Sequence, residues 1–556
     1  MQTKKTLFLL TLTTPFLTAP LIAKKCENKH IEVLIPFNPE DSRYKNFETI
    51  ATKYNLEQAK LPDFTQVKII TSSNRNNLYY QTSLDLTSND PYVSDLVIHY
   101  PSLAFLINSH NRLLDFSTEI STSGIYPEFL EVNKRAFPSS TIGILPAGIS
   151  TDSLIVNKIT LGYILTRIQE IIDQKFPTKK LLSPLGEKTR LLEIIEHYKN
   201  ASDHKKSEID KAWNFANVLN LEALKNAKLE YSDSILLNYY DMFAFSNEIA
   251  AILNNKEQKE PKRLLYNHHI PNLLFQMQFN NAGCDYDEYF VKPRTTTSPY
   301  LNYKPIFEKG SSSYNSLKEV YDIETQASFN LALHIQKKMP LTVPPAFYDT
   351  IFSLISSHSS FEWIKQYNKL LTEKDFLYMQ SPMKNKAEQT KSSFLNQGIN
   401  IMGISHSPEK NKKIKKFVNW LYDTKSRQNW QLIYKTVDED KSPKTHVIAL
   451  KNLTPIEYYA FACNYVFPSK EFISEFKASK ISELDPISYN YTQTIEAFKA
   501  SPQTIKMFEE PFDNKSNILR DRIKNDLIDF FNRKSLKKPY SFEEFIARLN
   551  EGNDFN

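Results

Sequence analysis

The sequence predicts an α/β protein, and two observations support that fold class. Strand-like segments at 30–41, 65–73 and 94–102 alternate with helical patterns at 44–59, 76–88 and 103–117. Such alternation is typical of a parallel sheet that helices cover on both faces. A hydrophobic content of 41% over 556 residues indicates a folded chain long enough for two or three domains or one large two-lobed body.

The elements after this first unit are assigned in chain order from the same periodicities. They are two close strands within 140–158, a mostly helical region from 158 to 224, a helical region from 241 to 357 with a loop-rich interruption at 282–315, strands at 375–384 and 399–407, and helices with loops to Asn556. The sequence therefore predicts a second region in which helices outnumber strands.

A very basic helix is predicted over residues 410–430. Four apolar residues lie at helical spacing and predict one docked face: Ile414, Phe417, Val418 and Leu421. Trp430 lies off this face, so we expect it to mark the helix end and to pack against another element. The lysines flank the docked face or oppose it, where their ammonium groups stay in water. The pattern favours the outer layer of an α/β domain.

The charge balance and the first residues bear on location. A net charge of +6 from 69 basic and 63 acidic residues is too small for a dedicated nucleic-acid protein, so no nucleic-acid partner is expected. Residues 1–26 combine Lys4 and Lys5 with a largely apolar run and predict an export segment. Cys26 is a candidate for lipid attachment, although cleavage after Ala23 or an uncleaved anchor are alternatives. We expect the body to lie at the extracellular face of the cell membrane.

The chemistry-bearing residues do not form a recognisable catalytic pattern. The sequence contains no GxGxxG, GxxxxGK[ST], HExxH, GxSxG or paired CxxC motif, so we expect no enzyme, no cofactor and no metal site. The adjacent pair His268 and His269 is interpreted as a surface pair in a polar turn. Cys284 and Cys463 are far apart in sequence, and a disulfide between them or two buried free thiols are both compatible with export.

Several segments follow one another in an order that is known from a protein family. They are 31–41, 94–117, 143–158, 209–220, 347–363 and 381–430. The last contains a proline-bearing strand, a turn at Gly398, a strand ending in Ile-Ser and a helix ending near Gln and Trp. In these segments the chain resembles bacterial extracellular solute-binding proteins of ABC importers, of the family 1 type with sugar- and glycerol-phosphate-binding members.

The resemblance implies a two-lobed periplasmic-binding-protein-like α/β fold with hinge segments and helical insertions. Residues 27–147, with part of 345–405, would form lobe one. Residues 155–340 would form lobe two, with a helical insertion at about 159–212. Helices within 406–556 would pack on both lobes. A ligand would then bind in the cleft at the carboxyl ends of the strands, and the lobes would close around it.

Residues directly after the predicted strands are the candidate ligand-binding groups. The hydrogen-bonding candidates are Asn38, Asp41, Ser72, Ser73, Asn74, His99, Ser150, Thr151, Asp152, Gln397 and Asn400. Tyr100 and Trp363 are aromatic candidates for stacking on a sugar face. Ser or Asn after a strand is also a common helix cap, so a capping role competes with ligand binding at these positions.

The resemblance implies a binding protein rather than a catalyst. It predicts capture of a small polar solute, such as a sugar or a glycerol-phosphate, and delivery to the permease and ATPase subunits of an ABC importer. The alternative is a surface lipoprotein of the same fold with a degenerate cleft, acting in adhesion or host interaction.

Overall fold

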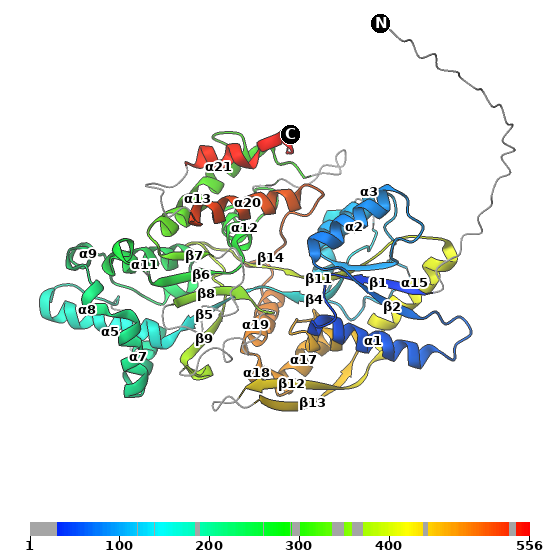
Figure 1. Cartoon of the computed structure of the whole chain (residues 1–556), viewed down its shortest axis with the longest axis horizontal. Helices are drawn as coiled ribbons and strands as arrows, with labels where there is room; N and C mark the ends of the chain where they lie inside the picture. The colour runs from blue at the N-terminus through cyan, green and yellow to red at the C-terminus, as the bar shows by residue number, and fades with distance from the viewer. Residues whose placement is uncertain are drawn as a thin grey trace, which may run out of the picture.

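The computed structural model has two α/β lobes, each built around its own sheet, as the sequence predicts (Figure 1). In Figure 1, β1 and β11 lie in the lobe on the right, and β5 to β8 lie in the lobe on the left. The structure describes residues 30–118, 120–137, 140–183, 189–259, 261–289, 291, 301–335, 350–358, 371–437, 443–532 and 541–555. Cys26 and Trp363 lie outside the described residues.

The sheet of the first lobe has the strand order β2-β1-β3-β11-β4. Its strands are β1 (Ile31–Ile35), β2 (Val67–Thr71), β3 (Leu96–His99), β4 (Leu145–Ser150) and β11 (Gln397–Gly403). β1 pairs parallel with β2 and β3, whereas β11 runs antiparallel between β3 and β4. β3 and β4 are buried along their whole length, which is typical of strands covered on both faces.

Helices α1 (Ser42–Gln58), α2 (Arg75–Thr87) and α3 (Pro101–Ser109) begin just after β1, β2 and β3. The Asp41 side chain accepts a hydrogen bond from the Arg43 amide at 2.8 Å and caps α1. Asn74 caps α2 through the Asn77 amide at 2.9 Å. Pro101 fills the first position of α3, where its missing N–H costs nothing. These helix starts therefore lie together at the carboxyl edge of the sheet.

The second lobe contains a mixed sheet with the order β7-β6-β8-β5-β9. Its strands are β5 (Asp152–Asn157), β6 (Arg263–Asn267), β7 (Leu333–Ile335), β8 (Thr350–Ser356) and β9 (Phe376–Gln380). β6, β7 and β8 lie in the region predicted as helical, and that prediction was wrong there. β8 is buried at every position, so its sequence lacks the alternation that distinguishes a half-exposed strand.

Helices of the second lobe surround this sheet and share one hydrophobic core with it. The region of the expected helical insertion forms α5 (Lys158–Lys175), α6 (Arg190–Lys199) and α7 (Asp203–Trp213), and Trp213 is fully buried. The other helices of this lobe are α8 (Phe215–Val218), α9 (Leu221–Asn226), α10 (Ser234–Leu237), α11 (Tyr239–Ile252), α12 (Ile270–Asn281), α13 (Ser312–Phe329), α20 (Ser516–Asn532) and α21 (Phe542–Leu549).

The basic helix of the sequence prediction is α15 (Pro408–Tyr422), and its predicted apolar face is buried, which confirms that face. The helix ends eight residues before Trp430, so placing Trp430 at the helix end was wrong. Trp430 lies in β12 (Gln428–Val437), which forms a hairpin with β13 (Pro443–Leu453). Its ring stacks on Tyr458 with a centroid distance of 4.3 Å, and its indole N–H donates to the Leu453 carbonyl. Packing against the hairpin partner overrides the helical pattern.

The remaining helices of the C-terminal region pack mainly with the first lobe. They are α16 (Pro455–Ala462), α17 (Lys470–Ala478), α18 (Ile481–Leu484) and α19 (Pro486–Ala500). α4 (Glu131–Ala136) packs in another core cluster of this lobe, with α2 and α3. α20 and α21 pack with the second lobe instead. Residues after 406 therefore contribute to both lobes.

The chain crosses between the lobes at short, hydrogen-bonded segments. Thr151 alone separates β4 from β5, and its carbonyl accepts from the Ser357 amide at 2.7 Å. β10 (Ser392–Leu395) pairs parallel with β14 (Ile505–Phe508) beside it. Phe394 lies in the core of the first lobe and Leu395 in that of the second. These crossings form the hinge region.

Two features of the remaining chain bear on the sequence predictions. Cys284 and Cys463 are buried free thiols, each in the core of a different lobe, so the free-thiol alternative applies. None of the helices in the described ranges combines the length and the apolar character that crossing a membrane requires.

Candidate ligand-binding cleft

A cavity of about 940 Å³ lies between the two lobes, at the carboxyl edges of their sheets. The first lobe lines it with the loops after β1, β2 and β3 and with residues near Tyr465. The second lobe lines it with the loops after β6 and β8 and with one side of α20. We call this cavity the cleft. In α/β sheets, ligands bind outside the carboxyl ends of the strands, so its position is that of a binding site.

The structure brings most of the sequence-derived candidates together in this cleft. Those that line it are Asn38, Asp41, Ser73, Asn74, His99, Tyr100, Ser150 and Gln397. Asn400 lines a smaller pocket that adjoins the cleft. Thr151 and Asp152 are buried at the hinge behind the cleft wall and do not line it, and neither does Ser72.

At the start of α1, Arg43 forms an ion pair with Asp41 at 2.5 Å and lies over the Phe37 ring at 3.9 Å. Burial alone would raise the pKa of Asp41, but the hydrogen bonds and charge of Arg43 lower it overall. Burial alone would lower the pKa of Arg43, but Asp41 and Tyr465 raise it overall. This pair is therefore charged and internally neutralised.

Arg75, the first residue of α2, has a different environment. Its guanidinium carbon lies 4.3 Å from the centroid of the Tyr100 ring, and Nη1 donates a hydrogen bond to the Tyr100 hydroxyl. Within the described residues, no carboxylate forms an ion pair with Arg75. Among these residues, its positive charge therefore faces the cleft without a partner acid.

Four histidines line the cleft, and three have strongly lowered pKa values. Burial is the main cause, and it lowers the pKa of His99 to about 4 and those of His268 and His358 to about 3. Neighbouring charges add to this effect: Arg43 and Arg75 act on His358, and His269, His358 and then Lys524 act on His268. These rings are consequently neutral at pH 7, where each presents one donor and one acceptor.

The histidine pair does not lie on the open surface, so its interpretation as a surface pair was wrong. His268 and His269 are partly buried at the start of α12 and stack on each other at 4.3 Å, and both line the cleft. His358, which follows β8 of the second lobe, stacks on Tyr465 with a ring-centroid distance of 4.6 Å and an interplanar angle of 8°. In the part of the chain that the structure describes, no three His, Cys, Asp or Glu residues are grouped so as to hold a metal ion.

A chain of polar contacts joins the two lobes, and two of its members, Gln397 and Arg520, line the cleft. Gln397 of β11 donates to Glu510 at 3.4 Å, and Glu510 pairs with Arg520 of α20. Arg520 also donates to the Asn272 oxygen at 2.8 Å, and the Asn272 amide donates to Asp152 at 3.0 Å. Because these residues come from both lobes and from the hinge, the network fixes how the cleft walls meet.

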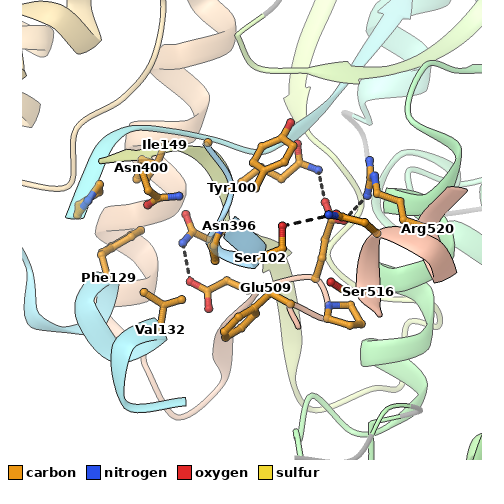
Figure 2. A pocket seen from close by; sticks show the side chains of 18 residues that line it. Tyr100, Ser102, Phe129, Val132, Ile149, Asn396, Asn400, Glu509, Ser516 and Arg520 are labelled. Atoms are coloured by element: carbon orange, nitrogen blue, oxygen red, sulfur yellow. Dashed lines mark hydrogen bonds and ion pairs between the residues drawn. The ribbon is translucent and has the colours of Figure 1, made fainter. Parts of the chain in front are cut away.

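Figure 2 shows the smaller pocket, which has a volume of about 60 Å³ and shares Tyr100 and Arg520 with the cleft. Phe129, Val132 and Ile149 form its apolar side. Its polar side contains Asn396, which donates to Glu509 at 3.1 Å; further residues of this side are Ser102, Asn400 and Ser516. A recess of this size accommodates a small substituent of a ligand rather than a whole solute.

The charged and aromatic part of the cleft was not predicted from the sequence; its residues are Arg43, Arg75, His358, Tyr465, Arg520 and Lys524. Arg43 and Arg75 come within two residues of predicted site residues, and a search for cations at predicted helix starts would have found them. Arg520 and Lys524 lie on α20, more than 400 residues from the first strand, and no local signal connects them to the cleft.

Several solved structures that share this fold contain a bound sugar or glycerophosphocholine. CpMnBP1 with mannotriose bound superposes with a TM-score of 0.52 and 12% identity, covering 95% of this chain and 100% of that chain. UgpB from Mycobacterium tuberculosis in complex with glycerophosphocholine gives a TM-score of 0.52 with 8% identity, and covers 95% and 98%. Maltose-bound MalE3 of T. maritima gives 0.51 with 9% identity, and covers 94% and 99%. At these identities the likeness shows the fold alone, and the names are those of binding proteins rather than enzymes.

Sequence relatives are lipoproteins of Mycoplasma pneumoniae. One uncharacterized lipoprotein is 24% identical over 342 residues, which are 49% of this chain and 42% of that protein. Another is 23% identical over 332 residues, 49% of this chain and 86% of that protein. The match thus spans less than half the length of the first of these two relatives and most of the second. Residues 395–531 match a family described as the C-terminal region of mycoplasma lipoproteins, and residues 205–364 match the Mycoplasma MG185/MG260 protein family.

Proposed function

We propose that this protein is an exported solute-binding protein that captures a small polar solute in the cleft and delivers it to an ABC importer. The observation that carries the proposal is the position of the cleft, at the carboxyl edges of two sheets that a short hinge joins. A sheet edge of this kind supplies loop amides, hydroxyls and helix starts that bind polar groups.

The proposed binding groups are those that line the cleft on the first lobe. Asn38, Ser73, Ser150 and Gln397 would donate to or accept from hydroxyl or phosphate oxygens, and Tyr100 would contact the face of the solute. The second lobe would close over the solute by rotation about the segments near Thr151 and Asn396. Closure would remove the solute from water and strengthen its polar contacts.

The proposal also assigns location and partners. Export through residues 1–26 would place the body on the extracellular face of the membrane, with Cys26 as the candidate site of a lipid anchor. The relatives named as lipoproteins support an anchored protein. Permease and ATPase subunits would receive the solute. We propose that lobe one consists of 27–147 with part of 345–405, and that lobe two consists of 155–340 together with β8 and β9, while helices of 406–556 pack on both lobes.

Thermal unfolding against a panel of sugars, sugar phosphates, glycerophosphodiesters, nucleosides and oligopeptides tests the proposal. A solute present at 100 times its Kd should add about 2.7 kcal/mol to the stability and raise Tm. Small-angle scattering of the same sample should show a smaller radius of gyration when the lobes close. Cooperative unfolding with the same Tm across the whole panel would count against a solute-binding role.

A second candidate is a surface lipoprotein of the same fold that acts in adhesion or host interaction. Exposed apolar side chains favour it: Tyr80 and Leu84 on α2 are 61% and 66% exposed, and Tyr92 nearby is 65% exposed. Substitution of Tyr80 and Leu84 by Ser would then lower binding to host cells. Unchanged cell binding, together with a solute-dependent Tm, would leave only the transport proposal.

A further inference from the structure

The charged side chains that line the cleft are not balanced. They are Asp41, Arg43, Arg75, Arg520, Asp521 and Lys524. Arg43 is neutralised by Asp41 and Arg520 by Glu510, whereas no carboxylate of the described residues forms an ion pair with Arg75 or Lys524. Arg75 belongs to the first lobe and Lys524 to the second. Asp521 lies one turn before Lys524 on α20 but forms no ion pair with it, so within the described residues each lobe presents a cation to the cleft that no carboxylate pairs with.

The helix starts at the cleft strengthen this positive character. α1, α2, α3 and α12 all begin at the cleft wall, and none has an acidic residue in its first turn. Some helices elsewhere have such residues, for example Glu409 in α15 and Glu457 in α16, whereas others, such as α5 and α13, do not. An acidic residue at this place offsets the positive end of the helix dipole. Of these four helices only α1 has an acidic group at its start, the capping residue Asp41, and two of the four have an arginine in the first turn.

The buried histidines also respond to the positive charge at the cleft. One of them, His99, has a ring nitrogen without a hydrogen-bond partner among the described residues. His99 is 3% exposed, its Nε2 contacts the Arg75 carbonyl at 3.1 Å, and its Nδ1 has no hydrogen-bond partner among the described residues. Besides burial, Arg43 and Arg75 of the first lobe lower the pKa of His358, and His269, His358 and then Lys524 lower the pKa of His268. Arg75 and Lys524 thus both lie close enough to the buried rings of the cleft to affect them.

We propose that the solute is an anion, held between Arg75 of the first lobe and Lys524 of the second. This inference rests on the proposed function and specifies its ligand. Closing the cleft on a neutral solute would bring two cations together while removing their water, which is unfavourable. An anion between them makes closure favourable, and an arginine binds a phosphate or carboxylate through two parallel hydrogen bonds. The shared chemistry is a phosphate ester or a carboxylate on a polar body.

Matched neutral and anionic solutes test the charge. Isothermal titration of the full-length protein, kept in mild detergent, would compare glycerol with glycerol 3-phosphate, and glucose with glucuronate and glucose 6-phosphate. Inorganic phosphate alone is a further probe. We expect an anionic member to bind at least 100-fold more tightly than its neutral partner, with an affinity that falls as salt rises. Glucuronate against glucose 6-phosphate distinguishes a carboxylate from a phosphate.

Single substitutions test the two residues. Arg75→Gln and Lys524→Gln should each weaken binding of the anion by about 10- to 100-fold, because each removes a charge-assisted hydrogen bond. Arg75→Lys should restore part of the affinity. Lys413→Gln is the matched control, because Lys413 is exposed on α15 away from the cleft, and it should bind as the original protein does. Unchanged circular dichroism and Tm of the ligand-free variants would exclude misfolding as the cause.

The possible results separate this inference from the proposed function. Equal binding of a neutral solute and its anionic partner, unaffected by Arg75→Gln and Lys524→Gln, would overturn the anion inference and leave solute binding intact. Absence of binding by every neutral and anionic probe would count against solute binding itself, and the inference would fall with it.

Discussion

The molecule has two cavities of nearly equal volume that differ in their walls. The cleft encloses about 940 Å³, and a second cavity beside β9 and α19, here called the rear cavity, encloses about 950 Å³. Loops after β1, β2 and β3 line the cleft, whereas no residue of these loops lines the rear cavity. The rear cavity also contains an acid in the first turn of α6, Glu193. Volume alone does not identify the binding site; the lobes and strand ends that contribute residues do.

The largest expected effect comes from the hinge side of the cleft. Gly398 has φ +146°, and a Cβ at this position would overlap the carbonyl oxygen of Gly148. Gly398→Ala should therefore destabilise the protein by about 3 kcal/mol or more and should abolish solute binding in the cleft. Thermal unfolding and titration would measure both effects.

Gly310→Ala is the control for Gly398→Ala. Gly310 also has a positive φ of +93°, but no atom lies within 4 Å of the place that a Cβ would occupy. It should cost only about 1 kcal/mol, the strain of the backbone conformation. Equal losses in the two variants would contradict the role assigned to the close approach of β4 and β11.

The next effect concerns a group that lies in neither cavity. Burial without a hydrogen-bond partner among the described residues raises the pKa of Glu324 to about 8, from 4.5. As pH rises from 4.5 to 8, the unfolded chain loses this proton first, so the native state loses stability over that range. Glu324→Gln should remove this loss and stabilise the protein at pH 8.5 by about 2 kcal/mol or more, with no such gain at pH 4.5.

Denaturant unfolding at the two pH values would measure the effect of Glu324→Gln. Glu308→Gln, at an exposed position, should leave the free energy of unfolding unchanged at both pH values. Since Glu324 lines neither cavity, solute affinity at pH 7 should stay the same. A changed affinity would show that stability of the second lobe, rather than contact with the solute, controls binding.

The smallest effects compare the two cavities directly. Tyr100→Leu in the cleft removes the ring that Arg75 lies over and should weaken solute binding by about tenfold. Gln493→Ala, at an exposed position that lines the rear cavity, should leave the affinity unchanged. Titration of both variants measures the two affinities. A loss of affinity in Gln493→Ala but not in Tyr100→Leu would indicate that the solute binds in the rear cavity.

The sequence predicts a helix or strand where only one of its faces is buried, or where strands and helices alternate along the chain. β1 to β3 and α1 to α3 have local signals, because each strand is short and each helix starts with a capping residue or a proline. β8 was missed because a strand that is buried at every position lacks alternation. β12 was missed because it follows a strong helical pattern after only a short turn. In that segment the pairing partner β13, not the local sequence, decides the structure.

The residues of the candidate site also fall into those that the local sequence predicts and those that depend on distant packing. Hydroxyl and amide side chains after strands can be predicted because a strand end fixes their place at the sheet edge, as for Asn38 and Ser73. Lys524 cannot, since α20 joins the cleft only through packing of the second lobe. The neutrality of His268 and His358 also depends on burial by distant segments.

The place of β11 in the first sheet governs when that lobe can form. β11 lies between β3 and β4 but follows β4 by about 250 residues in the chain. During synthesis, the first lobe therefore lacks an interior strand until most of the second lobe has been made, and its early strands have unpaired edges. The sheet of the first lobe therefore cannot be completed until residue 403 has been made, so this lobe folds as a unit only when most of the chain is available.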